Sequence, residues 1–351
     1  MFLTTLLFSA CSTKMDVTGQ YKETMVVYGL LDQSQTKQYI KINKAFLGQG
    51  NAFAYAQLKD SSQYAHALSV KLQRLDVYGN LVSEKTLSAD NTIPKDPGIF
   101  YSPDQANVIY SIDSAALGAG FFNTANNYKL VISNSETGTQ VSAQTSLISS
   151  IGLFVSPTPS TAANPVLSFI IPNNDNFRFF IKWNSGANAR IYQPSIRFNY
   201  IDSTISGTDA GNDTLHLDWQ FPSQNTQGLG GNEAMEFDFI GQEYLQFIGS
   251  QLSDKPLPAI ARRALKTEIH LTAGGDDLNT YIQVNAPSTG IVQDKPIYTN
   301  ITNGLGLLSS RFNEHPISRK LQSTTLDSLA CGRYTKGLKF LNSTGNLIIC
   351  P

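Results

Sequence analysis

The sequence predicts a mainly β protein, with an N-terminal immunoglobulin-like β-sandwich followed by a second β-rich region that holds one or two short helices. Composition is the first reason: charged residues make up only 15% of the chain, and hydrophobic residues make up 41%. The chain is also rich in Ser, Thr, Asn and Gln beside 26 Gly and 15 Pro, which favours strands and turns over helices. Short apolar runs separated by turn signals point the same way. At 351 residues the chain is long enough for two ordinary domains.

The first domain is expected over residues 21–150 as a β-sandwich. Runs typical of strands occupy 23–31 and 37–48, and the run at 67–87 reads as a hairpin that turns at Gly79-Asn80. Two further runs cover 107–113 and 127–148. Together they predict about seven short strands, as in an immunoglobulin-like sandwich.

The second β-rich domain is expected over residues 151–351, after a linker rich in Pro, Ser and Thr at 156–165. Strand-like runs occupy 166–172, 178–184, 190–202, 214–222 and 264–275. Pro194 interrupts the third of these runs, which predicts a sheet edge or a bulge. Apolar residues at helical spacing predict a helix near 241–252, and two aspartates open a short helix over 276–285.

The amino terminus has the pattern of an exported, lipidated protein. Residues 1–10 have the length of the hydrophobic part of a signal peptide and are expected to be a remnant of one. The residues FSAC, which end at Cys11, resemble a bacterial lipobox, so we expect lipidation at Cys11 and a lipidated tether over 11–20. Because no Lys or Arg precedes Cys11, we expect the true start to lie upstream. The alternative is an apolar first strand in which Cys11 is a buried free thiol.

The other two cysteines, Cys331 and Cys350, lie near each other in the sequence. In an exported protein two such cysteines predict one disulfide, which would fasten the intervening segment as a closed hairpin. Two separate buried thiols are the alternative. A zinc site is not favoured, because His315 is the one histidine near them in the sequence.

Residues 294–312, DKPIYTNITNGLGLLSSRF, form the most distinctive passage of the sequence. They resemble the closing signature P-x-x-x-x-N-[IV]-x-x-G-x-G-x-[FL] of an uncharacterised family of Bacteroidota outer-membrane lipoproteins. The matching residues are Pro296, Asn300, Ile301, Gly304, Gly306 and Leu308. The family's opening strand, V-V-x-G-x-[LI], is similar to residues 26–31. Glycines at 304 and 306 allow positive φ or close backbone approach, so a structural turn is favoured over a phosphate-binding loop.

The resemblance implies an outer-membrane or surface-exposed lipoprotein, because members of this family are typically encoded beside TonB-dependent receptors. Such a protein would be an accessory or substrate-capture subunit of a TonB-dependent transporter or of another β-barrel complex. Its expected partners are the outer membrane, through the lipid anchor, and a β-barrel outer-membrane protein. A surface enzyme acting on glycans or peptides, and a structural adhesin or assembly component, are the alternatives. A net charge of −1 without a basic run argues against nucleic acid as a partner.

Four Asp-Ser or Asp-Thr sequences resemble O-glycosylation acceptors of that phylum. The acceptor residues would be Ser114, Ser203, Thr214 and Ser328.

No catalytic constellation, cofactor-binding motif or metal-ligand pattern stands out, so the sequence predicts a protein that is not an enzyme and holds no cofactor or metal. Strand alternation places Glu268 and His270 on one face, near Asp276 and Asp277 in the sequence, and a solvated strand face is favoured there over a metal or acid–base site. The segment 209–213, DAGND, resembles half of a calcium loop but lacks its glutamate, which favours an ordinary turn.

Aromatic residues concentrate in the strand-like runs of the second domain. They could form a carbohydrate-stacking platform, but aromatics in strands more often fill a core. The candidates are Trp183, Trp219, Phe179, Phe180, Tyr192 and Tyr200.

Overall fold

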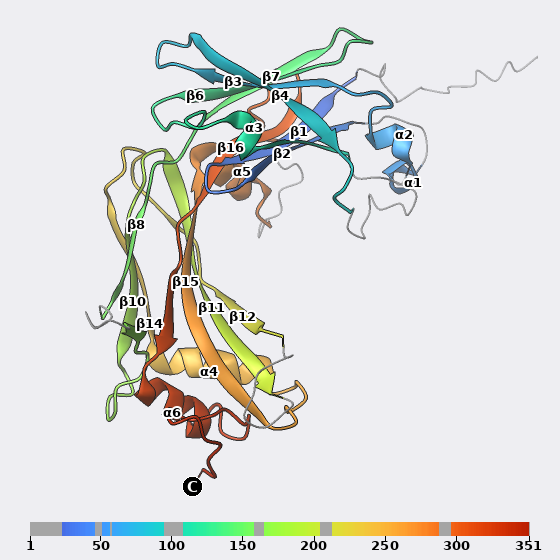
Figure 1. Ribbon diagram of the computed structural model, residues 1–351. Coiled ribbons are helices and arrows are strands. Elements are labelled where there is room, and N and C mark those ends of the chain that lie inside the picture. Colours follow the sequence, from blue (N-terminus) through green and yellow to red (C-terminus); the bar gives the residue numbers. More distant parts are fainter. Residues whose placement is uncertain are drawn as a thin grey trace, which may run out of the picture.

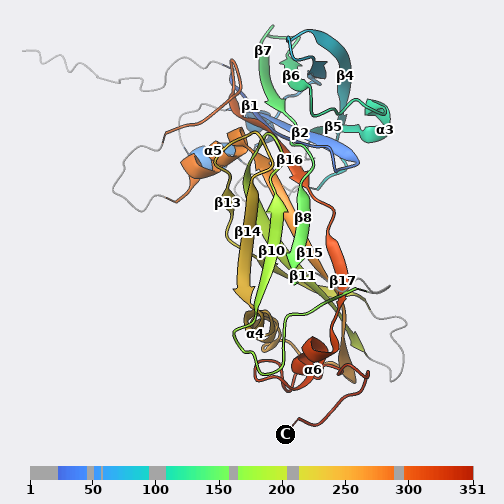
Figure 2. The same ribbon diagram turned by 90° about the vertical axis from the view of Figure 1, so that its left-hand side faces the viewer.

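Two β regions follow one another along an elongated molecule (Figures 1 and 2). The computed structural model describes residues 23–45, 51–56, 58–94, 108–157, 165–203, 213–287 and 296–350. The prediction of a mainly β fold is confirmed, since strands dominate both regions and the helices are short. Cys11, the segments 1–10 and 11–20, and most of the linker at 156–165 lie outside the described residues. Within the described part of the chain, no helix is long and apolar enough to cross a membrane.

The first region is a sandwich of two packed β layers. Its elements are β1 (Met25–Asp32), β2 (Lys37–Lys44), α1 (Ala52–Ala56), α2 (Lys59–Ser62), β3 (Ser69–Leu75), β4 (Leu81–Asp90), β5 (Ile109–Asp113), α3 (Ser114–Leu117), β6 (Asn127–Ser133) and β7 (Gln140–Ser146). Strands β1, β2 and β5 form one layer, and β3, β6 and β7 form the other. Strand β4 joins them, because residues 81–87 pair with β3 and 88–90 pair with β5. The predicted hairpin with its turn at Gly79-Asn80 is the β3–β4 pair.

The second region is a sandwich of a long-stranded sheet and a three-stranded sheet. Its elements are β8 (Gly152–Ser156), β9 (Val166–Leu167), β10 (Arg178–Asn184), β11 (Ala189–Ser203), β12 (Leu215–Gln220), β13 (Gln224–Asn225), β14 (Ala234–Ile240), α4 (Gly241–Leu252), β15 (Ala261–Gly275), α5 (Asp276–Asn285), β17 (Ile317–Leu321) and α6 (Ser323–Cys331). Strands β12, β11, β15 and β17 lie opposite the sheet β14–β10–β8. Helices α4 and α6 lie at the end of the molecule far from the first region (Figure 1). The helix predicted near 241–252 is α4, and the helix predicted at 276–285 is α5.

Strand β16 (Leu305–Asn313) comes late in the sequence but completes the first region. It pairs in parallel with β1 over seven residues, so that Val27 faces Gly306 and Gly29 faces Leu308. The two stretches on which the family resemblance rests are therefore neighbours in one sheet, although they lie at opposite ends of the chain. The boundary expected at residue 150 does not follow the sheets here, because Ile301 and Leu308 are buried in the core of the first region.

A buried carboxylate helps to join the two regions. The side chain of Asp32, at the end of β1, is 2% exposed and accepts hydrogen bonds from Arg311 Nε at 3.0 Å and from Asn313 Nδ2 at 2.7 Å. Asn313 in turn accepts a hydrogen bond from Thr272 of β15 at 2.8 Å. Because β15 also pairs with β16 over residues 272–274, the long sheet of the second region runs on into the first.

Helix α4 forms because its apolar residues recur at helical spacing on the side that meets the core. Tyr244, Leu245, Ile248 and Leu252 are buried, and Glu243 accepts the backbone N–H of Ile240 to cap the first turn. The helix can begin where it does because residue 241 is a glycine. A Cβ there would lie 1.6 Å from the Phe169 carbonyl oxygen.

Candidate functional site

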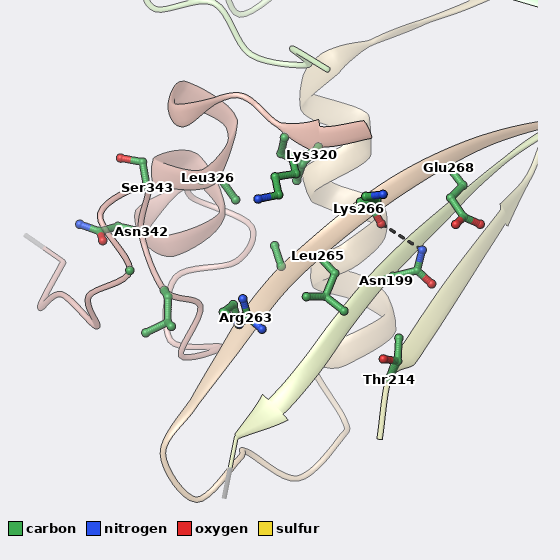
Figure 3. Close-up of a pocket in the computed structure, with 14 residues that line it drawn as sticks. Asn199, Thr214, Arg263, Leu265, Lys266, Glu268, Lys320, Leu326, Asn342 and Ser343 are labelled. Carbon is green, nitrogen blue, oxygen red and sulfur yellow. Dashed lines mark hydrogen bonds between the residues drawn. The ribbon is translucent and has the colours of Figure 1, made fainter. Parts of the chain in front are cut away.

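A groove of about 700 Å³ lies at the end of the second region that is far from the first (Figure 3). We call it the basic groove. Its floor is apolar and is made by Ala264 and Leu265 of β15, Leu321 of β17, Leu326 of α6 and Leu341 of the C-terminal segment. Three cations line it, Arg263, Lys266 and Lys320, and all three are exposed. Glu268 is the one acidic residue among the described residues of the lining.

A β-bulge in β15 gives the groove its cations. Phe198 of β11 pairs with Thr267 and Tyr200 pairs with Ala264, so the one residue between them on β11 lies opposite two residues of β15. Without the extra residue, Arg263 and Lys266 would point to opposite faces of the sheet, because side chains alternate along a strand. The bulge leaves both of them exposed at the groove.

The same bulge allows two polar residues of β15 to be buried on the inner side. Thr267 bonds with the Tyr244 hydroxyl at 2.8 Å, and Arg262 donates from Nε to Asp202 Oδ1 at 2.9 Å. Both Thr267 and Arg262 are 0% exposed, although they are an odd number of residues apart. A buried guanidinium needs partners, and Arg262 also donates to the Pro256 carbonyl oxygen at 2.9 Å. Arg262 is therefore structural, whereas its neighbour Arg263 belongs to the groove.

Most charges on the outer face beside the groove are already compensated. Arg197 makes two hydrogen bonds to the Asp218 carboxylate, at 2.7 and 2.9 Å, and this contact holds the pKa of Asp218 below its ordinary value. Glu268 faces His270, with Oε2 and Nε2 3.2 Å apart. Lys266 and Lys320 have no ion-pair partner among the described residues. The groove thus keeps a surplus of positive charge beside an apolar floor.

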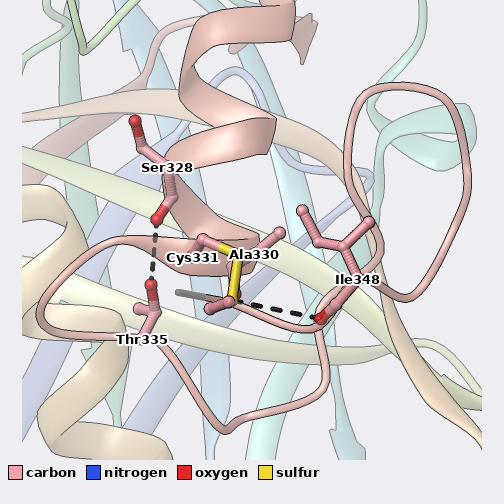
Figure 4. Close-up of a disulfide and its surroundings, with 6 residues drawn as sticks. Ser328, Ala330, Cys331, Thr335 and Ile348 are labelled. Carbon is pink, nitrogen blue, oxygen red and sulfur yellow. Dashed lines mark hydrogen bonds between the residues drawn. A yellow bond between two sulfur atoms is a disulfide. The ribbon is translucent and has the colours of Figure 1, made fainter.

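The far wall of the groove is a C-terminal segment closed by the predicted disulfide (Figure 4). Cys331, at the end of α6, is bonded to Cys350, with their Cα atoms 5.3 Å apart. The expectation that the enclosed segment forms a hairpin is wrong, because residues 332–350 fold as successive turns without a named strand. The side chain of Asn342 accepts the backbone N–H groups of both Thr344 and Asn346, and such local bonds favour turns over a strand ladder.

Further contacts fix this wall to the body of the second region. Leu341 N–H donates to the Arg262 carbonyl oxygen at 2.8 Å, and Ser343 N–H donates to Asp327 Oδ1 of α6 at 2.8 Å. Phe340 is 1% exposed and packs edge-on against Phe198 in the core. The groove is therefore preformed, with walls held by a covalent bond, main-chain bonds and an aromatic anchor.

Among the described residues beside the groove, no serine hydroxyl contacts an imidazole. Ser318 Oγ donates to Glu268 Oε1 at 3.4 Å, and Glu268 also faces His270, so the carboxylate lies between the hydroxyl and the imidazole. In a Ser–His pair it is the imidazole that contacts the hydroxyl, which is not the arrangement here. The predicted placement of Glu268 and His270 on one face is confirmed, while Asp276 instead accepts a hydrogen bond from Arg190 at 2.8 Å.

No three His, Cys, Asp or Glu side chains of the described residues converge as metal ligands. His315 is exposed, and His66 and His216 lie beside single carboxylates, those of Glu136 and Asp218. The segment 209–213, considered above as half of a calcium loop, lies almost entirely outside the described residues.

The aromatic candidates for a carbohydrate platform divide between core and surface. Trp183, Phe179, Tyr192 and Tyr200 are at most 2% exposed and belong to the core of the second region. Burial raises the pKa of Tyr192 to about 12, as expected for a hydroxyl that must lose its hydration to ionise. Phe180 and Trp219 are half-buried, and Trp219 lines a separate cavity described below.

Most of the family-signature residues hold the fold, and none of them lines the basic groove. The side-chain amide of Asn300 makes two hydrogen bonds to the backbone of Leu308. Nδ2 donates to the Leu308 carbonyl oxygen at 2.7 Å, and Oδ1 accepts the Leu308 N–H at 2.9 Å. Gly306 has φ +110°, and a Cβ there would lie 2.0 Å from the Val27 carbonyl oxygen. A Cβ on Gly304 would lie 2.9 Å from the Met25 carbonyl oxygen. Ile301 is 5% exposed, and Pro296 is exposed.

The four predicted glycosylation acceptors differ in access. Ser114 and Thr214 are exposed, Ser328 is half-buried and Ser203 is 7% exposed. The hydroxyl of Ser203 is thus accessible to a transferase only before folding. Thr214 lines the basic groove, so a glycan there would partly fill it.

Sequence reasoning missed the basic groove. Its cations come from β15 and β17 and its wall comes from residues 341–345, which no local motif connects. The odd spacing of Arg262 and Thr267 was the available signal for the bulge. It could be read only after both side chains were known to be buried.

Comparisons with known proteins give no family for this chain. No family model matches it, and no curated protein sequence matches it. Among solved structures, Salmonella alpha-2-macroglobulin reacted with methylamine has a TM-score of 0.21 at 9% identity, covering 90% of this chain and 16% of that one. The native alpha-2-macroglobulin of E. coli has a TM-score of 0.19 at 10% identity, covering 73% and 13%.

A DUF4785 family protein from Legionella pneumophila has a TM-score of 0.18 at 12% identity, covering 70% of this chain and 52% of that one. This chain therefore spans less than a fifth of the two macroglobulins and about half of the Legionella protein. Similarities this weak carry no argument about fold or function.

Proposed function

We propose that this protein is a non-enzymatic lipoprotein of the outer membrane or cell surface, anchored at Cys11, that captures a ligand for a TonB-dependent transporter or another β-barrel complex. The observation that carries the capture role is the preformed basic groove. It combines an apolar floor with three exposed cations, and the described residues around it bring no serine hydroxyl into contact with an imidazole.

The chemistry of the groove indicates the class of ligand. Leucine and alanine side chains on the floor favour an apolar portion, since burying apolar surface is the main source of binding energy in such sites. Lys266 and Lys320 favour an anionic group at the rim, because the cations of the groove outnumber the carboxylate of Glu268. The ligand we infer is an amphiphilic anion, such as a carboxylate that carries an alkyl chain.

The disulfide supports an exported location. Disulfides persist in oxidising compartments and are rare in the reducing cytosol. The Cys331–Cys350 bond closes the segment that forms a wall of the groove, so reduction would loosen the site itself. The lipobox-like sequence that ends at Cys11 supplies the anchor in this proposal.

The anchor and the partner are tested in cells. The wild-type protein should be found in the outer-membrane fraction and co-purify with a β-barrel protein after mild detergent extraction, and Cys11→Ser should be found in the soluble exported fraction. A Cys11→Ser protein that stays in the outer membrane would contradict the lipid anchor. A wild-type protein that purifies alone would contradict the transporter partner and favour an adhesin.

The groove is tested with the purified Cys11→Ser chain, which lacks the lipid, and with dodecanoate as probe; binding is measured by calorimetry below micelle concentration. Binding should weaken on raising salt, and the variant Lys266→Glu/Lys320→Glu should lose most of it. Lys255→Glu is the matched control, because Lys255 is exposed and lies outside the groove. Equal binding of dodecanoate and the neutral detergent dodecyl maltoside would show that the cations do not select the ligand. Turnover of a glycan or peptide substrate that His270→Ala abolishes would establish the surface enzyme instead.

A further inference from the structure

The second region has another cavity, on its open side between two edge strands. Strand β12 ends the long-stranded sheet and β14 ends the three-stranded sheet, so no strand closes the gap between them. A cavity of about 510 Å³ lies there, lined by β12, β14 and one side of α4. We call it the aromatic cleft, after its residues Trp219, Phe237 and Phe247.

The cleft is framed by fixed elements. At one end the side chain of Gln224 in β13 donates from Nε2 to the Glu236 carbonyl oxygen of β14 at 3.1 Å, which joins the two sheets. At the other end α4 follows directly after β14, so its first turn is anchored to the strand. A cavity held open by such elements does not have to be ordered by its ligand, which lowers the cost of binding.

Aromatic rings form the inner surface of the cleft in a packed arrangement. The Trp219 indole is stacked on Phe247, with ring centroids 5.2 Å apart and planes 8° apart, and Phe237 packs on Phe221 at 4.4 Å. Trp219, Phe237 and Phe247 are only half-buried, so each has part of its ring uncovered. The Trp219 indole N–H has no hydrogen-bond partner among the described residues, and the edge of the ring is therefore a free donor.

The rim of the cleft offers polar groups but no free cation. Gln220 and Gln246 are exposed, and neither side-chain amide has a partner in the described part of the chain. Glu243 uses one carboxylate oxygen to accept the Ile240 N–H, and Asp238 is paired with Arg178. Amides both donate and accept hydrogen bonds, as the hydroxyls of a neutral ligand require. An anion would meet two carboxylates here, in contrast to the basic groove.

We infer that the aromatic cleft binds a neutral saccharide. A pyranose ring has an apolar C–H face that packs on an aromatic ring, and hydroxyls around its edge that need donors and acceptors. Trp219 and Phe247 supply the aromatic surface, and Gln220, Gln246 and the Trp219 N–H supply the polar contacts. Of the aromatic residues considered from the sequence, Trp219 alone is placed in a cavity with this combination.

The test uses the purified Cys11→Ser chain and four neutral hexasaccharides: β-1,4-glucan, β-1,4-xylan, β-1,4-mannan and α-1,4-glucan. Calorimetry and tryptophan fluorescence are the readouts, because Trp183 is fully buried and a ligand can contact only Trp219. We expect at least one hexasaccharide to bind and to change the fluorescence. Trp219→Ala should weaken its binding by about tenfold, the factor that an aromatic contact contributes.

A second variant protects the test against misfolding of Trp219→Ala. Gln220→Ala/Gln246→Ala changes only exposed side chains, and it should weaken binding severalfold without changing the far-UV circular dichroism. Tyr78→Ala, which removes an aromatic side chain that is 87% exposed in the first region, is the matched control and should leave binding unchanged.

Three results would overturn the inference. They are no binding of any hexasaccharide to the wild-type protein, binding that both cleft variants retain in full, and binding that Lys266→Glu/Lys320→Glu abolishes. The last result would place the saccharide in the basic groove. Binding of the peptide Ala-Trp-Ala, but of no saccharide, would assign the cleft to apolar peptide side chains instead.

Discussion

The two regions of this molecule are stabilised in different ways. The first has a mainly aliphatic core and is completed by β16, a strand whose backbone lies so close to β1 that residue 306 must be a glycine. The second has a core much richer in Phe, Tyr and Trp, and its end is fastened by the Cys331–Cys350 disulfide. Both cavities with a distinctive chemistry lie in the second region.

This difference suggests a division of roles. A sandwich closed by a segment from the far end of the chain resists opening, since its edges depend on contacts across the whole sequence. Large aromatic side chains leave irregular surface where two sheets fail to meet, as at the aromatic cleft. Because both tryptophans lie in the second region, tryptophan fluorescence reports on that region alone, whereas far-UV circular dichroism reports on both.

The largest effect is expected for Gly306→Ala, which acts on the first region. The new Cβ would collide with the Val27 carbonyl oxygen, 2.0 Å away, and φ at this residue is +110°. Strain and steric overlap together should lower the free energy of unfolding by about 3 kcal/mol or more. Urea unfolding followed by circular dichroism measures the change.

The matched control is Gly79→Ala, because Gly79 also has positive φ, +86°, but a Cβ there would meet nothing within 4 Å. Gly79→Ala should lower the free energy of unfolding by only about 1 kcal/mol, because it adds the strain of positive φ without a steric collision. Equal losses for the two variants would mean that the close approach of β16 to β1 contributes nothing. If Gly306→Ala shifted the circular dichroism and fluorescence transitions equally, the two regions would unfold together and would not be stabilised separately.

The next largest effect is expected for Cys331→Ser/Cys350→Ser, which acts on the second region. Removing a disulfide between residues 19 apart should lower the free energy of unfolding by about 3 kcal/mol, through the entropy gained by the unfolded chain. The fluorescence transition should move to lower urea, and dodecanoate binding should weaken because the wall of the groove is loosened. Wild-type protein in reducing agent should show the same shift of the fluorescence transition. If the urea midpoint of this transition did not change in the double variant, the turns and Phe340 would be sufficient to hold the wall of the groove.

The sequence was sufficient where a local pattern determines the structure. Helix α4 begins and ends at the predicted residues, because apolar side chains at helical spacing and the glycine at its start agree with the fold. Pro194 does not lie at a sheet edge, because β11 is an interior strand. It falls in the gap between the stretch of β11 that pairs with β12 and the stretch that pairs with β13, where no partner strand needs its N–H.

The sequence was insufficient where distant segments meet. No local signal shows that β16 belongs beside β1, since a parallel pair can be joined by any long connection. The same holds for the basic groove, whose cations depend on a bulge, and for the C-terminal turns expected as a hairpin. There the side chain of Asn342 competes successfully with strand pairing.

A smaller effect is expected for Asn300→Ala, which again acts on the first region. The substitution removes two side-chain hydrogen bonds and leaves the N–H and carbonyl oxygen of Leu308 without these partners. The expected cost is about 2 kcal/mol, measured by urea unfolding. Asn300→Asp retains the acceptor but, above pH 6, sets a carboxylate oxygen against the Leu308 carbonyl oxygen, so it should cost at least as much as Asn300→Ala. If it equals the wild type, the Nδ2 bond to Leu308 contributes nothing.

The smallest expected effect is on the pH dependence of stability, to which one carboxylate in each region contributes. Asp90 in the first region accepts hydrogen bonds from Lys37 at 2.7 Å and from Thr92, which hold its pKa well below the ordinary value. Arg197 lowers the pKa of Asp218 in the second region in the same way. A group whose pKa is lower in the folded state contributes fully above its unfolded pKa, about 4, and loses this contribution as the pH falls through the folded pKa.

Both regions should therefore lose stability as the pH falls below about 4, which unfolding midpoints measured at successive pH values would show. Asp90→Asn should flatten the pH dependence of the circular dichroism transition, and Asp218→Asn that of the fluorescence transition. The effect should be greater for Asp90, because its side chain is 8% exposed, whereas Asp218 is 35% exposed and its ion pair is weakened by water. If Asp218→Asn flattened both transitions equally, the two regions would share one cooperative unit at low pH, since the contacts of the Asp218 carboxylate among the described residues are with Arg197 and His216 of the second region.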